Sequence, residues 1–151
     1  SWINKNVALS SSRISHSFGI LIPALFFHFM ITFLEYNKSR RFQIQLAYFS
    51  CGVMALLSLT SLVVTDLVPK LNMPFYPVGK MGYIIYIFLY CFWVIYAHIL
   101  AIKAYGGSSN FKQNQLKYFL IGTIFGFLGG ATCFPLIFGH KKVEYALYST
   151  N

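Results

Sequence analysis

The chain has 151 residues, of which 57% are hydrophobic and only 10% are charged. A water-soluble domain of this size has no way to cover so much apolar surface, so this composition argues against an ordinary soluble protein. The formal net charge of +9 does not indicate nucleic-acid binding, because the Lys and Arg residues lie at the ends of apolar runs rather than on one soluble surface.

Four apolar runs follow one another along the chain. They cover about residues 17–36, 43–68, 81–105 and 116–138. About 20 apolar residues cross a bilayer as a helix, and long runs without period-two alternation favour helices over a barrel. We therefore expect an all-α fold, a polytopic integral membrane bundle with four transmembrane helices in a single domain over residues 1–151. Because the chain has no initiator Met and no leader pattern, we expect it to be a fragment of a larger membrane region.

The connections between the runs are short and carry most of the charge. Pro69, Pro74 and Pro77 in the second connection prevent it from continuing as a helix. Counted by side, the basic residues divide evenly and give no orientation. Three of them, however, fall within the turn "NKSRRF" after the first run. This local density favours cytoplasmic first and third loops.

Gly122, Gly126 and Gly130 recur every fourth residue in the last run, "IGTIFGFLGGATCFP". Lipid tails are as apolar as Leu, so membrane helices associate through close contact at small residues spaced in this way. The spacing predicts a helix-packing face. It does not decide whether the partner helix belongs to this chain or to a second copy, and we expect a homodimer or contact with other membrane helices.

Polar side chains inside the apolar runs are costly unless they are bonded, so they should face protein. The first run carries a polar stripe that includes His28 and Glu35, and the second carries a hydroxyl face that includes Ser50 and Ser58. On the third run, Tyr83, Tyr86, Tyr90 and Trp93 share one arc. These three faces predict a pocket for a small amphipathic or aromatic ligand, although hydroxyls bonded to neighbouring carbonyls would give the same pattern.

His28 and His98 lie at comparable depth on two runs that cross in the same direction. Paired imidazoles of this kind can hold a haem iron, which leaves a haem or quinone carrier as an alternative. A carrier of four helices would be expected to have more such pairs, so we expect no cofactor and treat both histidines as pocket or core residues. The cysteines, Cys51, Cys91 and Cys133, all lie in apolar runs and are interpreted as small buried hydrophobes.

No metal-ligand spacing, carboxylate pair, nucleophile with a base or phosphate-binding loop occurs in the connections. We therefore expect neither a metal site nor catalysis within this chain.

Three stretches resemble a known family. "QLKYFLIGTIFGFLGGATCFP" resembles the penultimate span of the seven-helix membrane sensor region at the amino end of many bacterial histidine kinases and related signalling proteins. "FGILIPALFFHFMITFLE" is similar to the third span of that region, and "FYPVGKMGYIIYIFLY" to the start of its fifth. The resemblance covers about spans three to six and implies cytoplasmic first and third loops, with a cytoplasmic output domain beyond the last helix.

The sequence and the resemblance together predict a sensory input module of a two-component or similar signal-transduction protein, in the bacterial cytoplasmic membrane. It would couple a ligand or membrane signal to an output domain, with the lipid bilayer and a small amphipathic ligand as partners and no nucleic acid. The ligand-binding candidates are His28, Phe75, Tyr76, Tyr86, Tyr90, Trp93 and His98. The alternative is a structural or assembly subunit in which the glycine face docks a partner.

Overall fold

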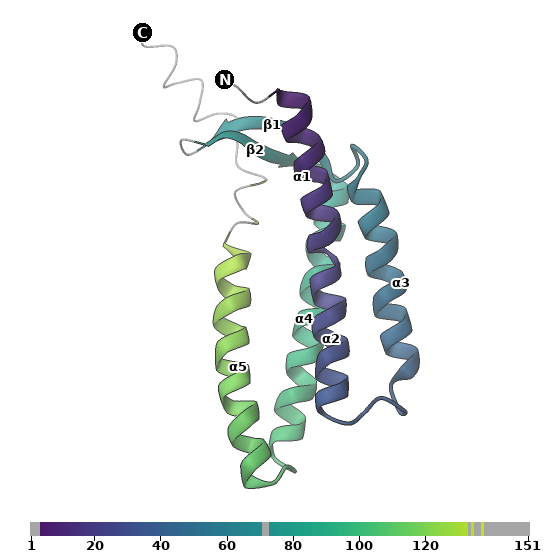
Figure 1. Cartoon of the computed structure of the whole chain (residues 1–151), viewed down its shortest axis with the longest axis vertical. Helices are drawn as coiled ribbons and strands as arrows, with labels where there is room; N and C mark the ends of the chain where they lie inside the picture. The colour runs from purple at the N-terminus through teal and green to yellow at the C-terminus, as the bar shows by residue number, and fades with distance from the viewer. Residues whose placement is uncertain (1–3, 71–72, 133, 135–136, 138–151) are drawn as a thin grey trace.

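The computed structural model describes residues 4–70, 73–132, 134 and 137, and it arranges them as helices standing side by side with a hairpin across one end (Figure 1). The elements in chain order are α1 (Lys5–Gly19), α2 (Leu21–Phe33), α3 (Arg41–Ser58), β1 (Val64–Lys70), β2 (Met73–Gly79), α4 (Met81–Tyr105) and α5 (Asn110–Ala131). The loops over 34–40 and 106–109 lie together at the end of the bundle opposite the hairpin.

Helices α1 and α2 continue one another through Ile20. The interruption has a local cause, because Pro23 lacks the N–H that would bond the carbonyl of Gly19. Ile20 keeps a right-handed backbone, so the two helices form one column over Lys5–Phe33. The helical column thus begins at Lys5, twelve residues before the predicted start of the first run at Ser17.

The expected all-α bundle of four transmembrane helices is wrong. Among the described residues only two helical segments, Lys5–Phe33 and Met81–Tyr105, are long and apolar enough to cross a membrane. Helix α3 has only 18 residues and starts with the polar sequence "RFQIQ". Helix α5 starts with "NFKQNQLK", so its apolar part is short. Length and apolar composition therefore mark two segments, while α3 and α5 pack beside them.

The predicted helical end of the second run is also wrong. Residues up to 68 were expected to be helical, but α3 ends at Ser58 and β1 pairs with β2 in an antiparallel hairpin. The β-branched stretch "VVT" favours extended backbone over helix. Pro77 is tolerated opposite Leu67 because each strand of a two-stranded sheet has an open edge.

The hairpin is tied to α1 by two polar contacts. Lys5 Nζ lies 2.8 Å from Asp66 Oδ1, and Arg13 Nε donates to the carbonyl of Val64 over 3.1 Å. The hairpin therefore closes the amino-terminal end of the α1–α2 column.

The turn after α2 has an unusual residue at its key position. Glu35 has a φ of 63°, a left-handed backbone that glycine usually provides. The amide of Tyr36 donates to the carbonyl of Ile31 over 2.9 Å and that of Glu35 to Thr32 over 3.0 Å, the paired bonds of a Schellman motif. The carboxylate of Glu35 accepts from Lys112 Nζ at 3.0 Å, so the turn is also linked to α5.

The core lies mainly where α2 and α4 pack together. Ala24 on α2 and Ala97 and Ala101 on α4 are completely buried. Ala97 and Ala101 are four residues apart, the spacing that lets two membrane helices approach closely. In the described bundle, this small-residue contact belongs to α4.

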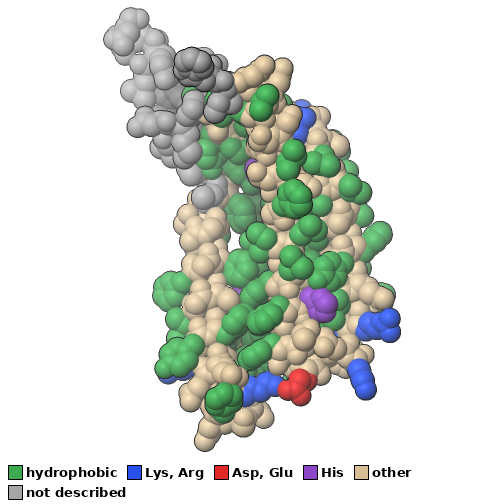
Figure 2. Space-filling view, viewed as in Figure 1, with side chains coloured by type: hydrophobic (Ala, Val, Ile, Leu, Met, Phe, Trp, Pro, Cys, Tyr) green, Lys and Arg blue, Asp and Glu red, His purple; other side chains and the backbone are tan. Residues whose placement is uncertain are grey.

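The outward faces of the helices are apolar. Phe18, Phe49, Phe88 and Phe125, on four different helices, are each about 70% exposed. Figure 2 shows green side chains along the length of the molecule, and most of the blue Lys and Arg side chains on this face lie at the lower end. Contiguous apolar surface of this extent marks contact with membrane or protein rather than with water.

Gly82 gives a test of this packing. A Cβ at Gly82 would overlap the carbonyl oxygen of Leu62, whereas a Cβ at Gly52 would meet nothing within 4 Å. We expect Gly82→Ala to destabilise the purified chain by about 1–3 kcal/mol, the usual cost of overpacking. Gly52→Ala, inside α3, should stabilise it by about 0.5–1 kcal/mol. Thermal unfolding in one detergent measures both, and equal unfolding midpoints for the two variants would contradict the close approach of Gly82 to Leu62.

Candidate functional site

Helix α4 supplies most of the predicted site residues, and it presents them to different neighbours. Trp93 lies in the core between α2, α3 and α4, where Nε1 donates to Ser50 Oγ over 3.2 Å. Its ring packs on Phe27 with centroids 4.9 Å apart. The indole is only 3% exposed. Trp93 therefore joins three helices and does not line a ligand site.

Tyr86 lies near the start of α4 and contacts α1. Its hydroxyl donates to the carbonyl of His16 over 3.2 Å, and its ring stacks on Tyr83 at 5.2 Å. The hydroxyl of Tyr83 lies 3.4 Å from His16 Nε2. The sequence analysis gave His16 no role. His16 reaches this position because α1 begins at Lys5, well before the predicted start of the first run.

His28 faces α3 rather than α4. Its Nδ1 lies 3.0 Å from the hydroxyl of Tyr48, and the two rings meet edge to face at 5.6 Å. The partly exposed pair lies on the outer side of the contact between α2 and α3. Tyr48 was not predicted, because nothing in the sequence of α3 distinguishes it from the surrounding apolar residues.

His98 faces α5. Its Nδ1 lies 2.7 Å from the carbonyl of Val94, and its Nε2 lies 3.0 Å from Thr123 Oγ1. The carbonyl only accepts, so Nδ1 carries the hydrogen in a neutral imidazole, and Thr123 must then donate to Nε2. The carbonyl of Phe119, 2.9 Å from Thr123 Oγ1, is the alternative acceptor for the same hydroxyl hydrogen.

A cavity of about 370 Å³ lies between α4 and α5. Ligand pockets in proteins have volumes of about 300–1,000 Å³, so the volume of this cavity is large enough for a small ligand. Its lining is almost entirely apolar, and the polar side chains that it includes are Tyr90 and His98 from α4. The walls are completed by Cys91, Val94, Ile95, Ile99 and Ile102 of α4, by Ile124, Phe127, Leu128 and Ala131 of α5, and by Phe134.

Of the seven predicted ligand-binding residues, the structure brings Tyr90 and His98 to this cavity. Phe75 and Tyr76 lie on β2, where Tyr76 is buried beneath the hairpin. Neither lines the cavity, and neither do His28, Tyr86 and Trp93. The polar faces of the three predicted runs therefore meet only in part. Trp93 of the third run bonds Ser50 of the second, whereas His28 bonds Tyr48 and Tyr86 bonds the carbonyl of His16.

Helix α5 is attached by ring contacts, by the hydrogen bond between Thr123 and His98, and by the ion pair between Lys112 and Glu35. Phe26 of α2 packs on Phe119 at 5.9 Å and on Phe127 at 4.8 Å, and Phe119 also lies near Phe29 and Phe33. Figure 2 shows the molecule hollowed between α5 and the α1–α2 column. The attachment is therefore uneven, with contacts along one narrow strip of α5.

The glycine face of α5 lies outside that strip. A Cβ at Gly122, Gly126 or Gly130 would meet nothing within 4 Å. All three residues are exposed. The contact with α4 is made instead by Leu116, Thr123 and Phe127, so the predicted packing face has no partner among the described residues.

A haem held by His28 and His98 does not fit this geometry, because the two rings are bonded to Tyr48 and Thr123 on different helices. The described part of the chain contains no group of three or more His, Cys, Asp or Glu residues able to hold a metal ion.

Comparisons with known protein families, with curated proteins and with solved structures give no match to this chain.

The bond between His98 and Thr123 is a measurable link between α4 and α5. A double-mutant cycle with His98→Phe and Thr123→Val should give a coupling energy of about 0.6 kcal/mol, the mean for such bonds between membrane helices. The measurement is thermal unfolding of the four proteins in detergent. Thr132→Val is the matched control, because Thr132 bonds the carbonyl of Gly129 in its own helix. A coupling of zero, or an equal coupling between His98 and Thr132, would mean that the link contributes nothing.

Proposed function

We propose that this chain is a membrane-embedded sensory input module that binds a single-chain amphipathic ligand between α4 and α5 and passes a displacement of α5 to the residues that follow. The observation that carries this proposal is the apolar cavity with Tyr90 and His98 on its α4 wall. The resemblance to the sensor region of bacterial histidine kinases supports the same function, with a two-component output.

Membrane location is supported by the two apolar segments, Lys5–Phe33 and Met81–Tyr105, and by the apolar outer faces. Lys38, Arg40, Arg41, Lys103 and Lys112 lie in or near the loops 34–40 and 106–109, with three of them close together in the first loop, whereas Lys5, Arg13, Lys70 and Lys80 lie at the hairpin end. We place these loops in the cytoplasm, following the positive-inside rule, and the chain in a bacterial cytoplasmic membrane.

The lining of the cavity defines the chemistry of the ligand. Isoleucine, valine, leucine and phenylalanine side chains favour a hydrocarbon body and offer it no hydrogen bonds. Tyr90 contributes a hydroxyl to the lining that can bond a polar end, whereas both ring nitrogens of His98 are already bonded to Val94 and Thr123. A fatty alcohol or fatty acid has both parts, so it fits the cavity better than a sugar, a nucleotide or an ion.

Signal transfer requires that the ligand bind two arrangements of α5 with different affinity. Helix α5 suits this role because it contributes one whole wall of the cavity while Phe119 and Phe127 hold it to α2. A ligand whose hydrocarbon chain lies between α4 and α5 would press on Ile124, Phe127 and Leu128. It would also change the distance across the bond from His98 to Thr123.

Dodecanol titrated into the full chain in maltoside micelles tests the binding step. Because a ligand that binds only the native state stabilises it, saturable binding should add about 2.7 kcal/mol at a hundredfold excess over its dissociation constant. Ala131→Phe should fill part of the cavity and abolish the stabilisation. Thr132→Phe, one residue further along and outside the cavity lining, is the matched control.

Hydrogen exchange on the same samples tests the coupling step. We expect dodecanol to change exchange in α5 of the unmodified chain and of Thr132→Phe, with little change in α3. Stabilisation that survives Ala131→Phe would remove the cavity as the site. Stabilisation without any change in α5 would leave a binding protein but not a sensor.

The alternative function is a structural subunit, which the open glycine face of α5 favours. A helix packed there would tolerate no side chain, so Gly126→Leu should disrupt a complex isolated from the native membrane. In the sensor, Gly126→Leu leaves the dodecanol response intact, because Gly126 does not line the cavity.

A further inference from the structure

A second cavity, of about 210 Å³, lies at the end of the bundle opposite the hairpin. It is lined by Tyr36, Ser39 and Arg40 from the loop after α2 and by Leu100 and Lys103 from α4. Two of the five lining residues are cationic and none is acidic. The apolar cavity between α4 and α5 shares none of these residues, so the two spaces are separate.

The carboxylate nearest in sequence does not neutralise this cavity. Glu35 accepts from Lys112 Nζ at 3.0 Å, on the side of α5. Asp66, the other acidic residue of the described chain, lies with Lys5 beside the hairpin at the opposite end of the bundle. The positive charges of Arg40 and Lys103 therefore face the cavity without an acidic side chain in its lining.

Arg40 is held in place by neutral partners. Its Nη1 donates to Gln43 Oε1 over 2.8 Å and to Tyr96 Oη over 2.7 Å. A guanidinium has five N–H donors, and these two bonds use only the pair on Nη1. The N–H groups of Nε and Nη2 form the planar fork that binds two oxygens of a phosphate. The guanidinium also lies 5.8 Å from the ring centroid of Tyr36, which further fixes its position.

The backbone adds positive potential at the same place. Arg40 is the N-cap of α3, an 18-residue helix with no side-chain cap and no acidic residue in its first turn. The first amides of a helix lack partners within it and attract anions. The Schellman turn at Glu35 and the bond from the Arg40 amide to the carbonyl of Tyr36, at 3.0 Å, fix the loop that carries Tyr36, Ser39 and Arg40.

We propose that this cavity binds a phosphate group, held by the fork of Arg40, the ammonium of Lys103 and the start of α3. The phosphate belongs to a phospholipid headgroup or to a soluble phosphate, and both present the same oxygens to these groups. Ser39 also lies in the lining, but its hydroxyl hydrogen is donated to the carbonyl of Tyr36 over 3.1 Å, so it is not counted among these donors.

Isothermal titration calorimetry on the full chain in maltoside micelles tests the site with three probes: sodium phosphate, dioctanoyl phosphatidic acid and dioctanoylglycerol. We expect saturable binding of at least one phosphate-bearing probe and none of dioctanoylglycerol. Binding of phosphatidic acid alone identifies a lipid source. Binding of inorganic phosphate as well shows that the phosphate group is sufficient, and binding of inorganic phosphate alone identifies a soluble ligand.

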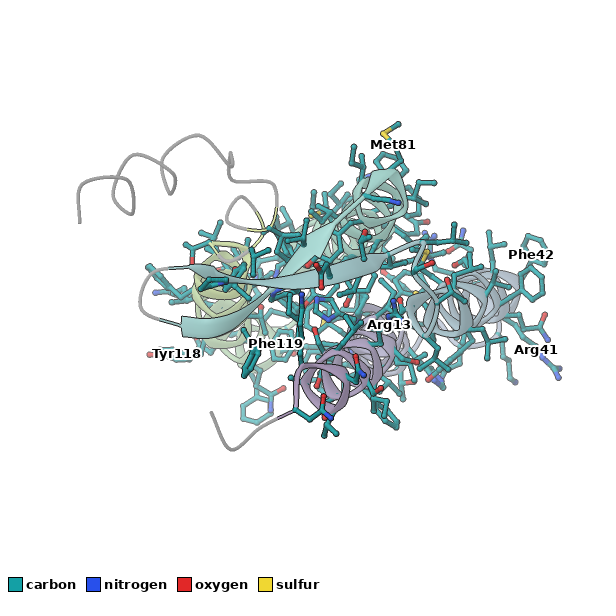
Figure 3. All side chains as sticks on the ribbon, turned by 90° about the horizontal axis from the view of Figure 1, so that it is seen from above. Arg13, Arg41, Phe42, Met81, Tyr118 and Phe119 are labelled. Carbon is teal, nitrogen blue, oxygen red and sulfur yellow. The ribbon has the colours of Figure 1, made fainter. Side chains whose placement is uncertain are left out.

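Charge-removing variants locate the binding. Lys103→Gln and Arg40→Gln should each weaken it about tenfold or more, as loss of a charged hydrogen bond does. Arg40→Gln removes bonds that hold the fold together, whereas Lys103 is exposed. If Arg40→Gln disturbs folding, the binding measured for Lys103→Gln therefore tests the site. Arg41→Gln is the matched control, because Arg41 lies one residue further on and points away from the bundle (Figure 3). Failure of both phosphate probes to bind, unchanged binding in Lys103→Gln, or an equal loss in Arg41→Gln would overturn the proposal.

Discussion

The constraint on which the rest of the structure depends is that the helices present apolar side chains both inward and outward. Phe27 and Trp93 pack on one another in the core, while Phe49 of α3 and Phe125 of α5 are exposed. In water these exposed apolar faces would be driven to associate or to be buried. In hydrocarbon the outer faces are solvated, and cohesion has to come from close contact and from polar bonds between helices. The buried Ala97 and the bond from Trp93 to Ser50 supply one contact of each kind.

The helices also differ in how many polar contacts join them to their neighbours. Helices α1 to α4 are joined by polar contacts at several depths, among them those of His16, Ser50 and Arg40. Helix α5 is held by ring contacts, by the bond from Thr123 to His98 and by the ion pair from Lys112 to Glu35. The apolar cavity and the cationic cavity lie on either side of the lower half of α4, one against α5 and one against the loop after α2. A ligand in the first would act on the loosely held helix.

Composition and periodicity predict the helical character of most of the chain and the bounds of α4, because a largely apolar stretch of 25 residues, interrupted by His98 and Lys103, leaves few alternatives. They fail at residues 59–68, which were assigned to the second span, because the β-branched residues there belong to strand β1 of the hairpin instead. They predict less about the site. The residues from Tyr83 to Trp93 do share one arc of α4. Which neighbour each side chain meets depends on how the helix is rotated and on which helices pack beside it, and the spacing of residues within one helix defines neither. The glycine spacing predicted contact, whereas the close contact is made by alanines of α4.

The most direct measurement places single cysteines at Ser39 and Ser108, in the two loops at the basic end, in a chain whose Cys51, Cys91 and Cys133 are replaced by Ala. The chain is inserted into sealed vesicles and treated with a membrane-impermeant maleimide, followed by an alkaline carbonate wash. We expect the chain to stay with the bilayer after the wash and both cysteines to be labelled from the same face. Release of the chain by the wash, or labelling of the two positions from opposite faces, would contradict a bundle solvated by hydrocarbon with its basic end on one side.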